Sequence, residues 1–153
     1  MKKYTEEDIK VVDWDAHVKK NPTMYYGDKE ISPEELGKAI EYSALILGAK
    51  KLSNVQIDDW WYFCSDVDWL FKSTYRIKSV VEVFNGPCPF PEAEQQNAFR
   101  TEAVVLPFVT DAFTIANDQV VTLKGTVPSK STIKNIVNKL GEWERIVAYK
   151  TNA

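Results

Sequence analysis

The sequence predicts an α+β fold, a two-layer sandwich of a mixed, mostly antiparallel sheet with helices on one face. Two hairpin patterns and one well-capped amphipathic helix predict this class. Each hairpin pattern places two turn-forming residues, Asp58-Asp59 or Asn117-Asp118, between short runs of β-branched and aromatic side chains. Such residues favour tight turns between paired strands. The runs are 55–57 and 61–64 in the first hairpin, and 114–116 and 120–123 in the second.

The clearest helix begins at Ser32. A hydroxyl at the cap, Pro33 at the first helical position and Glu35 three residues on form the pattern of a capping box. Apolar or small residues then recur with helical spacing, which predicts one buried face. These residues are Leu36, Ala39, Ile40, Ser43, Ala44 and Leu47.

The remaining elements have weaker signals. Residues 74–84 fit either a strand or a helix that ends at Asn85-Gly86-Pro87. Residues 101–112 have a helical pattern that Pro107 interrupts. Ser131 is expected to cap a last helix, and residues 145–149 are expected to form a closing strand.

Composition indicates one soluble domain. The chain has 153 residues, a net charge of −3 and no Lys/Arg cluster beyond doublets, so a nucleic-acid partner is not expected. No apolar stretch approaches the length of a membrane span or follows the basic start as a secretory signal would, which predicts a cytoplasmic protein without a membrane partner. Cys64 and Cys88 are expected to be free thiols, and with one histidine no metal-ligand spacing is present.

A specific motif lies near the start of the chain. Tyr4-Thr5-Glu6-Glu7-Asp8-Ile9-Lys10-Val11-Val12 is followed by Ala16-His17-Val18-Lys19-Lys20-Asn21-Pro22-Thr23-Met24-Tyr25-Tyr26-Gly27-Asp28. This segment resembles the start of the DNA gyrase B subunit, the N-terminal ATPase domain of type II topoisomerases in the GHKL superfamily. The resemblance implies a single domain over 1–153, a compressed, degenerate GHKL (Bergerat)-like fold with an arm and Met-Tyr-Tyr-Gly-Asp segment over 1–31.

The groups that such an ATPase needs are not where the resemblance would put them. Its helix carries a Glu that activates water and an Asn that holds magnesium, but here those positions fall on Tyr42 and Ile46, or on Glu41 and Leu45. In the resemblance, Asp66 corresponds to the Asp that binds adenine, and Val67 and Trp69 replace the two glycines that follow that Asp. The lid region, 95–102, has no glycine. We therefore expect no ATP hydrolysis, no catalytic residues and no cofactor.

The expected function is that of a non-catalytic, protein-binding domain on a gyrase-B-like scaffold. An immunity protein, antitoxin or inhibitor that neutralises a protein partner is one form of it, since an acidic, aromatic-rich domain suits capture of a basic partner. Two alternatives stay open. One is a sensor of ATP or ADP, or a weak ATPase; the other is a partner protein of topoisomerase. A homodimer, with the arm exchanged, is compatible with each.

Aromatic and acidic side chains are the candidate contact residues, because interface hot spots combine them. The alternative for Tyr42 and Trp69 is that they fill the vacated nucleotide cavity. The alternative for the aspartates is that they are turn residues. A calcium site among the aspartates is also an alternative, but their spacing is not that of an EF-hand. The candidates for protein binding are Trp60, Trp61, Trp69, Asp58, Asp59, Asp66, Asp68 and Tyr42, and those for an arm or dimer contact are Tyr4, Met24, Tyr25 and Tyr26.

Overall fold

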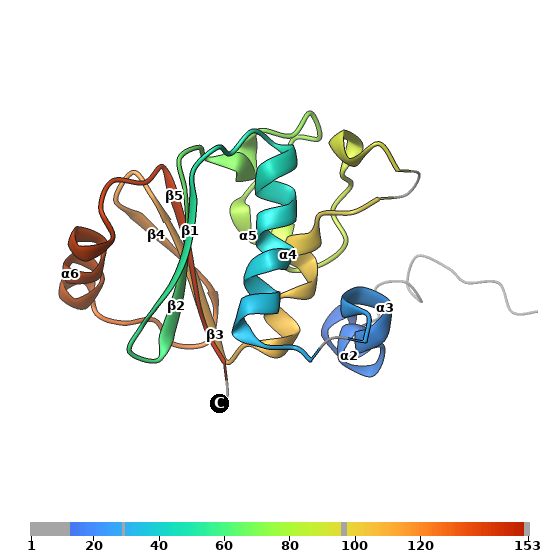
Figure 1. Cartoon of the computed structure of the whole chain (residues 1–153), viewed down its shortest axis with the longest axis horizontal. Coiled ribbons are helices and arrows are strands. Elements are labelled where there is room, and N and C mark those ends of the chain that lie inside the picture. The colour runs from blue at the N-terminus through green and yellow to red at the C-terminus, as the bar shows by residue number, and fades with distance from the viewer. Residues whose placement is uncertain (1–12, 29, 96–97, 152–153) are drawn as a thin grey trace, which may run out of the picture.

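Five strands form one sheet, which a computed structural model describes over residues 13–28, 30–95 and 98–151. The strand order is β1-β2-β5-β3-β4, and each neighbouring pair is antiparallel, so the sheet expected to be mixed is antiparallel throughout the described residues (Figure 1). The strands are β1 (Leu52–Ile57), β2 (Trp60–Ser65), β3 (Asp111–Ala116), β4 (Gln119–Lys124) and β5 (Arg145–Lys150). The helices are α2 (Trp14–Lys20), α3 (Pro22–Tyr26), α4 (Pro33–Ile46), α5 (Val80–Phe84) and α6 (Lys130–Leu140), with short 3-10 turns η1 (Trp69–Phe71), η2 (Pro91–Ala93), η3 (Thr101–Val104) and η4 (Leu106–Phe108).

Strand β5, the last element of the chain, occupies the middle of the sheet. It pairs with β2 on one side and with β3 on the other, so it joins the two hairpins β1-β2 and β3-β4. Residues 145–149 are all buried. A strand that is covered on both faces carries a nearly continuous apolar run, and Ile146-Val147-Ala148-Tyr149 is such a run. The predicted last strand is confirmed, and it is central to the sheet.

Both predicted hairpins are present, and each turn contains at least one residue with positive φ. Asp58 has φ 55°, while Asn117 and Asp118 have φ 52° and 61°. Two consecutive residues in this left-handed region are typical of a type I′ turn, whose twist matches that of the flanking strands. Asn and Asp tolerate the region better than most residues with a Cβ, so the turn residues help to set the strand register.

Helix α4 begins where the sequence predicts. Ser32 Oγ accepts a hydrogen bond from the backbone N–H of Glu35 at 3.2 Å, and Pro33 is the first helical residue. The helix ends at Ile46, where Leu47 and Gly48 follow, and Gly48 has φ 106°. The capping box therefore fixes the start of the element that covers the sheet.

The N-terminal end of α4 lies close to the sheet. Tyr149 Oη of β5 donates to the carbonyl of Pro33 at 2.7 Å and accepts from Asn54 Nδ2 of β1 at 3.2 Å. Gly37 permits this approach, since a Cβ at this position would lie 2.0 Å from Asn54 Nδ2. A side chain larger than hydrogen at residue 37 would displace the Asn54 side chain and disturb its contact with Tyr149.

Two hydrophobic clusters cover the two faces of the sheet. Phe63 and Val147 face the cluster that contains α4 and α5, whereas Tyr62 and Ile146 face the cluster that contains α6. Because successive strand residues point to opposite faces, these alternating residues place α6 on the far side of the sheet from α4 (Figure 1). The layers of α4 and sheet fit the predicted sandwich. The expectation that helices lie on one face only is wrong for α6.

The two segments with ambiguous patterns, 74–84 and 101–112, form short helical segments. Within 74–84, residues Val80–Phe84 form α5 and bury Val80, Val83 and Phe84, a spacing of three and four that suits a helix. The region 101–112 is not one helix: η3 and η4 occupy its first part, and β3 starts at Asp111. Pro107 lacks an N–H and restricts the preceding residue, which explains the break.

Helix α6 begins earlier than the sequence suggested. Its cap is Ser129, whose Oγ accepts from the backbone N–H of Thr132 at 3.3 Å, and Ser131 lies inside the first turn. Both serines are chemically competent caps, so the choice depends on where Pro128 and the preceding loop direct the chain.

Helices α2 and α3 pack against the same side of the molecule as η3. Trp14 Nε1 donates to the carbonyl of Ala103 at 2.7 Å, and Tyr26 Oη donates to the carbonyl of Val104 at 2.7 Å. Across the described ranges, none of the helices has the length and apolar content needed to cross a membrane.

Candidate functional site

The space between α4 and the sheet is filled by side chains. The inner side of α4 contributes Leu36, Ile40 and Ala44, all fully buried. Trp69 of η1 and Phe63 of β2 belong to the same cluster, and their ring centroids are 5.4 Å apart in an edge-to-face arrangement. This region between the helix and the sheet is therefore a packed core.

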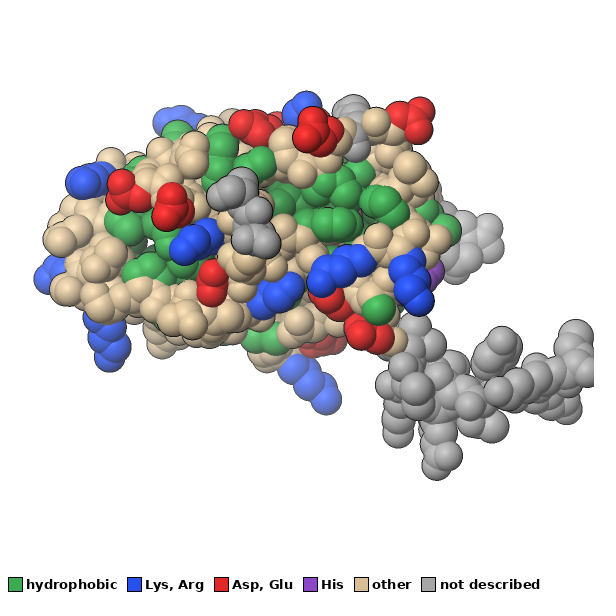
Figure 2. Space-filling model, turned by 90° about the horizontal axis from the view of Figure 1, so that it is seen from below, with side chains coloured by type: hydrophobic (Ala, Val, Ile, Leu, Met, Phe, Trp, Pro, Cys, Tyr) green, Lys and Arg blue, Asp and Glu red, His purple; other side chains and the backbone are tan. Residues whose placement is uncertain are grey.

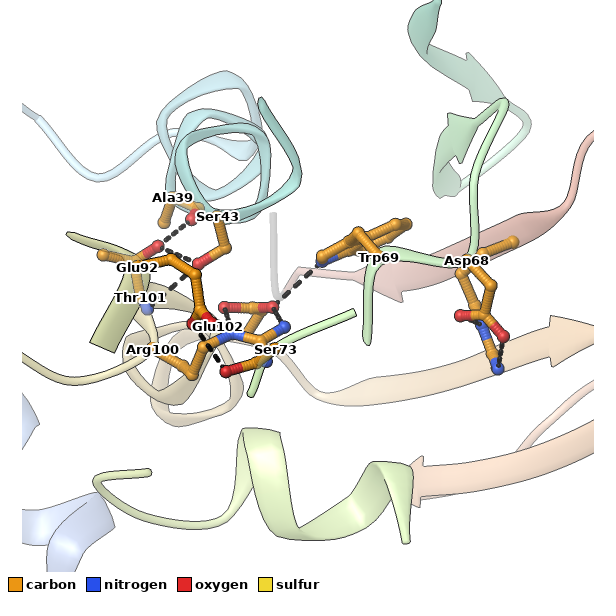
Figure 3. Close-up of polar contacts among 10 residues, drawn as sticks. Ala39, Ser43, Asp68, Trp69, Ser73, Glu92, Arg100, Thr101 and Glu102 are labelled. Atoms are coloured by element: carbon orange, nitrogen blue, oxygen red, sulfur yellow. Dashed lines mark hydrogen bonds and ion pairs between the residues drawn. The ribbon is translucent and has the colours of Figure 1, made fainter. Parts of the chain in front are cut away.

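A buried ion pair lies beside this core (Figure 3). Glu102 Oε2 accepts from Arg100 Nη2 at 2.6 Å and from Trp69 Nε1 at 3.0 Å, while Glu102 Oε1 accepts from Arg100 Nε at 3.3 Å. Both charged side chains are fully buried, and the guanidinium carbon lies 5.4 Å from the centroid of the Phe90 ring. Both oxygens of the Glu102 carboxylate therefore accept hydrogen bonds, whereas Arg100 Nη1 has no hydrogen-bond partner among the described residues.

Thr101, between the two charged residues, attaches the same segment to α4. Its hydroxyl donates to the carbonyl of Ala39 and lies 2.9 Å from Ser43 Oγ. Ser43 Oγ also accepts from the Thr101 N–H at 3.4 Å. Residues 100 and 102 therefore contact the core, while Thr101 between them bonds to α4.

Sequence reasoning missed this network. Arg100 and Glu102 lie in a stretch that was considered only for its lack of glycine. The available signal was a pair of opposite charges two residues apart immediately before Ala103-Val104-Val105-Leu106, since charged residues embedded in an apolar run are buried only when they are paired.

Trp69 is buried in the core, and Asp68 has a structural ion pair. Trp69 has no exposed surface, which confirms the alternative that it fills the core and corrects its assignment as a contact residue. Both carboxylate oxygens of Asp68 accept from Arg145, from Nε at 2.9 Å and from Nη2 at 2.8 Å. Arg145 is buried and its guanidinium also lies over the ring of Phe71, so Asp68 holds the start of β5 in place.

The remaining acidic candidates do not form one cluster. Asp58 and Asp59 are exposed at the β1-β2 turn, whereas Asp66 follows the other end of β2, about 20 Å away for a six-residue strand. Asp66 Oδ1 accepts from the Lys50 N–H at 3.0 Å, and hydrogen bonds from the backbone of Lys50 and Lys51 lower the pKa of Asp66. Asp66 therefore acts as a local turn residue. Within the described ranges, no three His, Cys, Asp or Glu side chains lie close enough to hold a metal ion.

Trp60 and Trp61 point to opposite faces of the sheet. Trp60 packs in the cluster of α6, with its ring centroid 5.1 Å from that of Phe113, and Trp61 packs in the cluster of α4. Both are half-buried. The two rings therefore lie on different surfaces of the molecule.

Tyr42 lies on an exposed apolar surface that sequence reasoning did not anticipate. Tyr42, Leu45 and Ile46 have exposed fractions of 44%, 51% and 36%, and their spacing places them on one side of α4. The alternative that Tyr42 fills the vacated cavity is wrong. The resemblance proposed from the sequence would align Glu41 or Tyr42 with a water-activating Glu, but neither belongs to the buried inner side of α4.

The Met-Tyr-Tyr-Gly-Asp segment is attached to the body of the domain by its tyrosines. Tyr25 Oη lies 2.8 Å from His17 Nε2, and Tyr26 bonds to η3 as described above. Burial raises the pKa of Tyr26. Met24 is the most exposed of the three, at 66%, and is free to touch a partner. Tyr4 lies outside the described residues.

Comparison of the chain with protein-family models, with curated proteins and with solved structures finds no significant match in any of the three.

Proposed function

We propose that this chain is a non-catalytic domain that binds another protein through the outer side of α4. The observation that carries the proposal is the exposed apolar surface formed by Tyr42, Leu45 and Ile46, called the α4 patch below. An amphipathic helix on a folded domain normally turns polar residues to water. A contiguous apolar surface on such a helix is typical of an interaction site.

The two halves of α4 differ in a way that supports this reading. On the outer side, its first turns carry Glu34 and Lys38, and its last turns carry the α4 patch. The inner side is buried along the whole helix. The apolar residues of the patch therefore do not serve the core of this domain, and burial in a partner would remove them from water at about 25 cal/mol per Å².

The packed interior supports a function without nucleotide chemistry. Trp69 and the Arg100–Glu102 pair are packed into the interior, whereas binding of a triphosphate would need glycine-flanked backbone and magnesium ligands. These features fit a gyrase-B-like scaffold that is reused for binding. The role that we favour is neutralisation of the bound protein, as by an immunity protein or inhibitor.

Affinity capture with face-specific variants tests the proposal. The whole tagged chain would be compared with a Leu45→Lys, Ile46→Lys variant in a lysate of the source cells, with captured proteins identified by mass spectrometry. Lysine has a helix propensity close to that of leucine, so α4 should persist and the urea midpoint should hardly change. An Asn135→Lys variant on α6 is the matched control, since Asn135 is exposed on the other side of the sheet.

The expected result is a protein captured by the parent chain and by Asn135→Lys but lost with the double lysine variant. Capture that is equal for all three chains would refute the α4 patch as the binding surface. A neutralising role further predicts that co-expression of the chain relieves any toxicity of the captured protein, and that the double lysine variant does not.

A further inference from the structure

A groove runs between the edge strand β4 and α6. Strand β4 pairs only with β3, so its other side presents unpaired backbone groups. The floor of the groove is apolar, with Val120 of β4, Ile115 of β3, and Ile133 and Val137 of α6. Hydrophobic side chains gather around a hollow at the left end of Figure 2, the end that carries α6.

We propose that this groove binds an extended, acidic segment of a partner protein, which adds to the sheet as a sixth strand beside β4. The inference goes beyond the proposed function, because the groove and the α4 patch lie on opposite sides of the sheet and either can exist without the other. Backbone hydrogen bonds to an edge strand supply affinity in such complexes, and alternate side chains supply specificity.

Geometry favours an extended chain over a helix or a compact ligand. Along β4, Val120 and Thr122 line the groove and share its side of the sheet, since Val120 pairs with Ile115 and Thr122 with Phe113. Alternate residues of an added strand would point to the same side. They would then lie over Ile133 of α6, with the intervening residues turned away from the groove.

The lysine residues around the groove favour an acidic partner segment. Lys130 and Lys134 line it from the first two turns of α6, and both are exposed. The N-terminal end of α6 adds the positive end of the helix dipole. Asp118, at the β3-β4 turn, is the one acidic residue among those that line the groove. In a chain with a net charge of −3, this basic rim favours a segment in which apolar residues alternate with Glu or Asp.

Short synthetic peptides test the proposal directly. Octapeptides in which Val, Ile or Phe alternates with Glu would be titrated into the 15N-labelled whole chain, and the same peptides with Lys in place of Glu serve as controls. We expect the acidic peptides to bind and to shift the amide signals of 119–124 and 130–138. We expect the basic peptides to bind at least about fivefold more weakly, the equivalent of one exposed charge pair.

A Lys130→Glu, Lys134→Glu variant should weaken binding of the acidic peptides by about tenfold or more, since two exposed pairs become repulsive. Lys139→Glu is the matched control, because Lys139 is exposed on the same helix but does not line the groove; its affinity should equal that of the parent chain. No binding by any peptide below about 1 mM, equal binding of acidic and basic peptides, or shifts confined to α4 would overturn the proposal. Concentration-dependent shifts at β4 without peptide would overturn it in favour of a second copy of this chain.

Discussion

Replacement of Glu102 by Gln should destabilise the fold strongly, although it changes only one side-chain atom. The fully buried carboxylate accepts three hydrogen bonds, two from Arg100 and one from Trp69. Gln keeps the shape and one acceptor oxygen, but it leaves the buried guanidinium without a counter-charge. Breaking a buried ion pair by removing one partner typically costs about 3–5 kcal/mol. Because the acceptor for Trp69 survives, we expect the lower end of this range, about 3 kcal/mol.

Removal of both charges should restore most of the loss. In an Arg100→Met, Glu102→Gln variant, the unpaired charge is gone and Trp69 Nε1 keeps its acceptor, so the free energy of unfolding should return to within about 1 kcal/mol of that of the parent chain. Urea unfolding followed by circular dichroism measures both variants and gives their coupling energy. A Glu102→Gln loss below about 1 kcal/mol, or a double variant as unstable as the sum of its single changes, would show that Arg100 reaches water and that the interior is not closed.

Three further outcomes follow from the same contacts. Titration calorimetry with ATP or ADP and magnesium should give no binding heat, and a magnesium-dependent dissociation constant in the micromolar range would contradict the packed interior. Asp68→Asn should lower the free energy of unfolding by about 2 kcal/mol, because Arg145 is buried, whereas Asp59→Asn at the exposed turn should change it by less than about 0.5 kcal/mol; equal effects would contradict the structural role of Asp68. Burial opposes ionisation of Glu92, but hydrogen bonds from Ser73 and Thr74 outweigh it and lower its pKa from 4.5 to about 2; its contribution is therefore complete above pH 4.5 and lost as pH falls towards 2, and Glu92→Gln should flatten the stability profile in that window.

Local signals in the sequence predicted the elements well. Asp58-Asp59 and Asn117-Asp118 identified both hairpins, and Ser32 with Glu35 identified the start of α4. These signals are short-range: a turn or a cap is decided by the conformational preferences of two to four neighbouring residues.

The strand order and the side of the sheet on which α6 lies could not be predicted from such local patterns. The position of β5 between β2 and β3, and of α6 on the face opposite α4, depends on pairings between segments that are far apart in the chain. Likewise the sequence placed Asp68 among the candidate contact residues, because its partner Arg145 lies 77 positions later. No local pattern links these two residues.

One error was avoidable. Trp60 and Trp61 are neighbours in a predicted strand, and successive strand residues point to opposite faces. The alternation alone predicts that the two rings lie on different faces of the sheet, so grouping them in one set of contact residues overlooked a signal in the sequence. The exposure of Leu45 was harder to predict from the sequence. Helical spacing identifies the inner side of α4, but it does not forbid apolar residues on the outer side.

The most direct measurement for the proposed binding surface is site-specific photo-crosslinking. A photoreactive phenylalanine analogue would replace Leu45 in one chain and Asn135 in another, and both chains would be irradiated in the source cells. A protein-binding α4 patch predicts a discrete adduct of one partner protein from position 45 and none from position 135. No adduct from position 45, or the same adduct from both positions, would contradict the proposal that α4 is where this domain meets its partner.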